Sequence, residues 1–183
     1  MGFFPEISLP APTFMEAPRK PLPWDDGVGV TALSDVVLAQ SAEGTVLLRS
    51  IVSFPESCIV TFEAILRRPL QHGPGTAGHN APSFFAKGEL STGLVLVGYE
   101  LSNGSWGSNF PEEHEGHRAF LGLGGGGGMF RGRHSFAMEI PPEGDVTFWV
   151  AWPVAAIAET STTIDATSIR EAAGASTARG DDR

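Results

Sequence analysis

Hydrophobic and polar residues alternate most clearly along residues 45–68. Residues 45–54 are rich in β-branched and aliphatic side chains, and the turn residues Pro55-Glu56-Ser57 follow them. In the second run every other residue is apolar: Cys58, Val60, Phe62, Ala64 and Leu66. Side chains of a strand alternate between its two faces, so two such runs around a turn predict a β-hairpin. Cys58 falls on its inward face, where cysteine is normally a small buried hydrophobe.

Three further strands are predicted over residues 94–101, 130–140 and 145–152. Asn103-Gly104 closes the first of them, and Asn-Gly is a strong two-residue hairpin signal because both positions tolerate positive φ. Trp149 and Trp152 are three positions apart, so in a strand they point to opposite faces. Residues 36–40 fit either another strand or one helical turn capped by Ser34.

The end of the chain predicts one helix over residues 166–173, with Asp165 as its N-cap and Gly174 as its stop. Residues 174–183 are small and polar, so we expect a disordered tail. Alternating βαβ units are absent from the pattern. The predicted fold is therefore mainly β: a single antiparallel β-sandwich-like domain over residues 28–173 with a short C-terminal helix.

The first 27 residues form a separate, proline-rich segment that holds six of the 14 prolines. Proline fixes φ and removes a backbone donor, so this N-terminal arm is predicted to be extended and unable to form a regular ladder. Its aromatic residues Phe3, Phe4, Phe14 and Trp24 are candidate anchors for an interaction. The arm either packs on its own domain or reaches a neighbouring subunit.

Composition and charge narrow the possible classes. Of the 183 residues 42% are hydrophobic, enough for one core, and only 18% are charged. The net charge of −9 argues against a nucleic-acid-binding module, which needs clustered Lys and Arg. One cysteine cannot form an intramolecular disulfide, and no run approaches about 18 apolar residues, so we expect a soluble, cytoplasmic protein without a membrane span.

Two polar or glycine-rich segments are candidates for chemistry. His114 and His117 lie among carboxylates in Glu112–His117 and are candidate metal ligands, although a solvated acidic loop fits the absence of an H-E-x-x-H motif better. The run Gly124–Gly128 lacks the Lys-Ser/Thr of a phosphate loop, and a strand rather than a helix follows it. It favours a flexible connection or close packing against another backbone.

Several turn and strand motifs together resemble a group of small uncharacterised β-rich proteins that is common in actinobacteria. The motifs are Phe54-Pro55-Glu56-Ser57, the strand and turn from Gly98 to Gly104, the glycine run, Pro141-Pro142-Glu143-Gly144, Phe148–Pro153, and Ile164-Asp165 before a short Ala-rich helix. The resemblance covers roughly residues 28–173. Its motifs are structural, so it implies a fold and no catalytic or cofactor-binding residue.

No motif in the chain has catalytic geometry. We therefore expect a non-enzymatic binding or structural module without a cofactor, which interacts with other proteins or with itself. The arm aromatics and Trp106, an aromatic beside the Asn103-Gly104 turn, are the expected contact residues, and an exposed Trp106 is also suited to stacking on a sugar. One alternative is a metal-dependent or small-molecule enzyme that uses the loops 69–92 and 107–128. Another is a structural component of a virion or particle.

Overall fold

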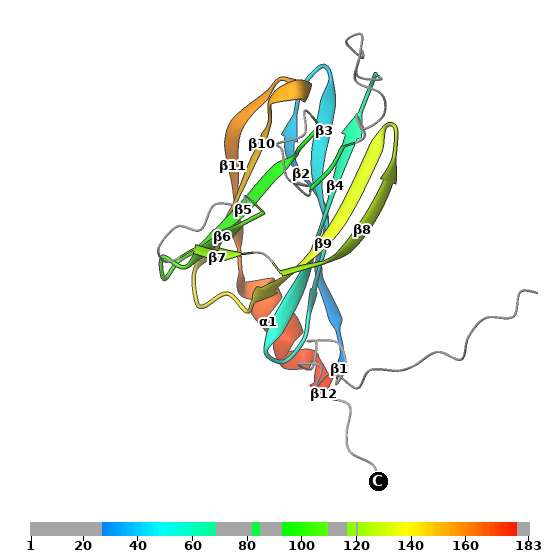
Figure 1. Cartoon of the computed structure of the whole chain (residues 1–183). Coiled ribbons are helices and arrows are strands. Elements are labelled where there is room, and N and C mark those ends of the chain that lie inside the picture. Colours follow the sequence, from blue (N-terminus) through cyan, green and yellow to red (C-terminus); the bar gives the residue numbers. More distant parts are fainter. Residues whose placement is uncertain (1–26, 69–81, 85–92, 110–116, 120, 179–183) are drawn as a thin grey trace, which may run out of the picture.

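The computed structural model describes residues 27–68, 82–84, 93–109, 117–119 and 121–178, and Figure 1 shows them in colour. Phe3, Phe4, Phe14 and Trp24 of the predicted arm lie outside the described residues, as does His114. The described part of the chain is mainly β, with two five-stranded sheets, one two-stranded pair and one short α-helix near the C-terminus. The predicted antiparallel, sandwich-like fold is therefore confirmed.

The first sheet contains five antiparallel strands in the order β2-β3-β4-β9-β8. Their bounds are β2 Val30–Gln40, β3 Gly44–Ser53, β4 Ser57–Leu66, β8 Leu121–Gly128 and β9 Arg131–Glu139. The predicted hairpin is β3–β4, in which Ser53 pairs with Cys58 across the turn. Residues 36–40, for which two interpretations were open, belong to strand β2.

The second sheet has the order β11-β10-β5-β6-β7. Its strands are β5 Leu96–Leu101, β6 Trp106–Ser108, β7 His117–Ala119, β10 Asp145–Trp152 and β11 Ile157–Asp165. All neighbours are antiparallel except β6 and β7, which are parallel. The Asn103-Gly104 turn joins β5 to β6 as predicted, and Gly104 has a φ of 82°. Strands β6 and β7 lie where the sequence indicated a polar loop.

Aromatic side chains from both sheets meet in the core between them. The ring of Phe62 on β4 lies 6.0 Å from that of Phe136 on β9 and 5.9 Å from that of Phe148 on β10, both in edge-to-face geometry. The apolar positions of the β4 alternation are all buried, as predicted. Each sheet therefore has one face in this core and one face toward the outside.

The C-terminal helix α1, Thr167–Ala175, packs its buried Ile169, Ala172 and Ala173 against the domain. Its N-cap is Ala166 rather than the predicted Asp165, although the backbone N–H of Thr167 donates to Oδ1 of Asp165 at 2.8 Å. The helix continues past Gly174, the predicted stop. The short strand β12, Thr177–Ala178, then pairs with β1, Gly27–Val28, in a segment where the sequence indicated a disordered tail. Residues 179–183 lie outside the described residues.

The glycine run forms most of strand β8 at the edge of the first sheet. It is thus a paired strand rather than a flexible connection. A Cβ at Gly125 would collide with the backbone of Arg133, and one at Gly127 with the backbone of Arg131. A Cβ at Gly126 or Gly128 would meet nothing within 4 Å. Close packing against another backbone, the second predicted reason for the run, therefore applies to Gly125 and Gly127.

Candidate binding groove

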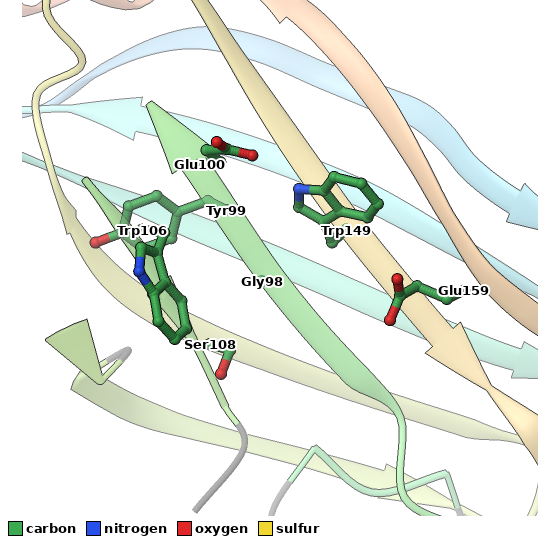
Figure 2. Close-up of a pocket in the computed structure, with 8 residues that line it drawn as sticks. Gly98, Tyr99, Glu100, Trp106, Ser108, Trp149 and Glu159 are labelled. Atoms are coloured by element: carbon green, nitrogen blue, oxygen red, sulfur yellow. The ribbon is translucent and has the colours of Figure 1, made fainter. Parts of the chain in front are cut away.

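The outer face of the second sheet carries a groove with a volume of about 380 Å³, drawn in Figure 2. It is lined by Gly98, Tyr99, Glu100, Trp106, Gly107, Ser108, Trp149 and Glu159. These residues come from four strands of one sheet, β11, β10, β5 and β6. The groove therefore lies on the strands of a sheet rather than among loops.

Strand register explains why this face is hollow. Trp149 on β10 pairs with Gly98 on β5, and Gly98 pairs with Ser108 on β6. Glycine has no side chain, so the middle strand leaves a gap between the outward groups of its neighbours. Adjacent strands are about 4.8 Å apart, which separates β10 from β6 by roughly 10 Å. A Cβ at Gly98 would fill part of this floor and would lie 3.1 Å from the carbonyl oxygen of Gly107.

Two tryptophans stand on either side of this glycine floor. Trp149 is 38% exposed, whereas Trp152 on the same strand is fully buried, so the prediction that they point to opposite faces is confirmed. Trp106 lies on β6 rather than at a loop tip and is half-buried. Figure 2 shows Trp106 and Trp149 on opposite sides of β5, with Trp149 between Glu100 and Glu159. The groove thus joins two indoles with two carboxylates.

The face that surrounds the groove is acidic. Strands β11, β10, β5 and β6 contain no lysine or arginine. Glu100 and Glu159 in the groove are exposed, as are Asp145 and Asp165 at the end of the β10–β11 pair. Hydrogen bonds from the hydroxyl and the backbone N–H of Thr167, and the charge of Arg170, lower the pKa of Asp165. This arrangement attracts cations and repels anionic ligands.

The predicted metal ligands are only partly placed by the structure. The backbone of His117, in β7, pairs in register with that of Trp106 at the border of the groove. Its predicted companion His114 lies outside the described residues. Within the part of the chain that the structure describes, no three His, Cys, Asp or Glu side chains are gathered to hold a metal ion. The metal hypothesis stays a prediction.

A thiol and an imidazole, those of Cys58 and His134, lie in the core, away from the groove. Cys58 is fully buried, and desolvation raises the pKa of its thiol to about 12. His134 is 4% exposed, and desolvation lowers its pKa to about 4. Cys58 pairs with Met138 across β4 and β9, whereas His134 pairs with Phe62, so the two residues are four register positions apart. They do not form a nucleophile–base pair.

A cluster of charged side chains on the outer face of the first sheet was missed by the sequence analysis. Glu63 occupies an outward position of β4 yet is only 2% exposed. Nε of Arg49 donates to its carboxylate at 2.5 Å, and the guanidinium of Arg133 lies 3.4 Å from it. Nη1 of the same guanidinium contacts Oδ1 of Asp35 at 2.5 Å. The hydrogen bonds to Asp35 and Glu63 raise the pKa of Arg49. The sequence signal is Glu63 and Arg133 at facing positions of β4 and β9, whereas Arg49 lies at an irregularity of the β3–β4 register and has no facing position.

Comparison of the chain with protein-family models, with curated proteins and with solved structures found no match. The resemblance to actinobacterial β-rich proteins therefore stays a prediction. Among the residues that the structure describes, no helix has the length and apolar character needed to cross a membrane.

Proposed function

We propose that this chain is a non-enzymatic binding module whose groove receives a cationic side chain of a protein partner. The observation that carries the proposal is the pair Trp106 and Trp149 on either side of the Gly98 floor, together with Glu100 and Glu159. Trp106 was expected to be a contact residue, and in this proposal it acts with a second tryptophan across the sheet.

Arginine suits this groove better than lysine. Its planar guanidinium stacks on an indole and also donates paired hydrogen bonds to a carboxylate. A cation over a tryptophan face contributes about 0.5–1 kcal/mol at an exposed site and about 2 kcal/mol when desolvated. The two carboxylates add attraction without any lysine or arginine on the four strands to compete for them. Phosphorylated or otherwise anionic ligands are disfavoured by the same charges.

The groove also supports a protein ligand by its shape. It lies open along the face of the sheet, across β10, β5 and β6 (Figure 2). Exposed tryptophans on a flat surface are enriched where proteins bind other proteins, because they supply a large contact area with few rotatable bonds. A short segment that presents one arginine fits the roughly 10 Å between the two outer strands.

Titration calorimetry with two short peptides tests the proposal. One peptide carries a central arginine, and the matched peptide carries citrulline, which has the same shape without the charge. We expect weak binding of the arginine peptide and at least about fivefold weaker binding after Trp149→Ala, from the loss of about 1 kcal/mol. Glu100→Gln with Glu159→Gln should weaken binding to a similar extent.

Glu171→Gln is the control variant, because Glu171 is an exposed carboxylate on α1, outside the groove. It should bind the arginine peptide as the unmodified chain does. Equal binding of the citrulline and arginine peptides would contradict a cation site. Binding of a neutral oligosaccharide that depends on Trp149, without binding of the arginine peptide, would assign the groove to sugars instead.

A further inference from the structure

A second surface of this chain carries exposed arginines, which the strands of the groove lack. At the turn between β8 and β9, Met129 is 64% exposed and Phe130 is 44% exposed. Four arginines lie around them, and we call the whole set the basic tip: Arg67, Arg68, Met129, Phe130, Arg131 and Arg133. All six residues are exposed at the same end of the first sheet.

Backbone pairing holds the two halves of the basic tip together. Ile65 on β4 pairs with Arg131 on β9, and the N–H of Leu66 donates to the carbonyl oxygen of Phe130 at 2.8 Å. Arg67 and Arg68 follow directly, so they lie beside the turn. Figure 1 shows the β8–β9 turn at the end of the sheet that is remote from α1.

Among the described residues, the cations are concentrated in this place. The described residues contain seven arginines and no lysine: Arg49, Arg67, Arg68, Arg118, Arg131, Arg133 and Arg170. Four of these seven belong to the basic tip, although the chain as a whole has a net charge of −9. The buried carboxylate of Glu63 lies 3.4 Å from Arg133 and 3.8 Å from Arg131. Arg67 and Arg68 are exposed and have no ion pair among the described residues.

We infer that the basic tip of one copy docks into the groove of a second copy. The inference rests on the proposed function, and it names the partner as this chain itself. The groove supplies two indoles and exposed carboxylates, and the tip supplies exposed guanidinium groups beside two apolar side chains. Charge and apolar surface are therefore complementary between the two sites.

The two sites are different patches, so the contact is head-to-tail. A head-to-tail contact leaves a free groove at one end and a free tip at the other, and it produces rings or open chains rather than closed dimers. Salt at physiological strength screens charges beyond about 8 Å, so the groups in contact outweigh the general repulsion between two acidic copies. The contact area of a hairpin turn is small, and we expect weak association that grows with concentration.

Sedimentation analysis of charge-swapped full-length chains tests this inference. One variant reverses the groove, Glu100→Lys with Glu159→Lys, and the other reverses the tip, Arg67→Glu with Arg68→Glu. We expect the average mass of the unmodified chain to rise with concentration and each variant alone to remain monomeric. An equimolar mixture of the two variants should regain association, because the lysine groove of one accepts the glutamate tip of the other.

The mixture should also grow beyond a 1:1 complex, since its remaining sites are the unmodified arginine tip of the groove variant and the unmodified acidic groove of the tip variant. Glu56→Lys with Glu171→Lys is the control for the groove variant, with the same change in net charge as that variant at exposed positions outside both surfaces. It should associate as the unmodified chain does. Circular dichroism confirms that each variant is folded.

A monomeric unmodified chain at all concentrations would overturn self-docking. If the arginine peptide still bound the groove of that monomer, the proposed function would stand and only the identity of the partner would fall. If peptide binding also failed, both would fall. Binding of the monomer to phosphatidylserine vesicles that is lost in Arg67→Glu with Arg68→Glu would assign the tip to an anionic membrane instead.

Discussion

The outer faces of the two sheets differ in the surroundings of their charged side chains. On the first sheet, Glu63 is enclosed by arginines and Asp35 occupies the far end of Arg49. On the second sheet, Glu100 and Glu159 lie beside an exposed tryptophan, and their four strands supply no cation. The charges around Glu63 are paired within the chain, whereas the groove leaves Glu100, Glu159 and Trp149 exposed to solvent.

This difference separates the residues that stabilise the fold from the residues that are available for binding. A buried carboxylate that loses its partner is costly, so the cluster around Glu63 belongs to the fold. An exposed indole contributes little to folding, and its removal should leave the domain intact. The groove face is therefore the part of this surface where substitutions change binding without loss of structure.

The largest expected contrast lies within β10. Trp152→Ala removes a fully buried side chain from the core and should lower the free energy of unfolding by about 3–5 kcal/mol. Trp149→Ala removes a side chain that is 38% exposed and should lower it by less than about 1 kcal/mol. Urea unfolding followed by circular dichroism measures both. A loss of several kcal/mol in Trp149→Ala would show that the groove face serves the fold.

A smaller contrast tests the charged cluster of the first sheet. Arg49→Met leaves the buried carboxylate of Glu63 with only its longer contacts to Arg133 and Arg131, and we expect a loss of about 2–3 kcal/mol. Asp35→Asn removes the exposed pair and should cost less than about 1 kcal/mol. Asparagine also tolerates the positive φ of 58° at position 35. Equal losses in the two variants, measured by thermal unfolding, would contradict the role of burial.

The smallest contrast lies at the edge of the first sheet. Gly125→Ala places a Cβ against the carbonyl oxygen of Arg133, so strands β8 and β9 must separate, and we expect a loss of about 1–2 kcal/mol. Gly126→Ala meets nothing within 4 Å and should be neutral or stabilise the domain by up to about 1 kcal/mol. Hydrogen exchange of the β9 amides reports the strand separation. Unchanged exchange in Gly125→Ala would contradict the close approach of the two backbones.

The alternation of apolar and polar residues predicted those parts of the fold in which a strand has one apolar and one polar face. It identified the β3–β4 hairpin, its inward residues and the opposite orientations of Trp149 and Trp152. It missed β8 because glycines have no side chain to alternate, and β11 because its run Ile157–Asp165 is mostly polar on both faces. The groove depends on register between β10, β5 and β6, which no single segment encodes. For this reason Trp106 was recognised as a contact candidate but its partner Trp149 was not.

The burial of Cys58 makes the chain convenient for site-specific labelling. It is the only cysteine, and a thiol with a pKa of about 12 has almost no reactive thiolate at neutral pH. A cysteine introduced at the exposed Ser161, which pairs with Trp149 across β10 and β11, would then be the one thiol that maleimide reagents modify. A single fluorophore placed there reports occupancy of the groove in the native chain, without removal of any core residue.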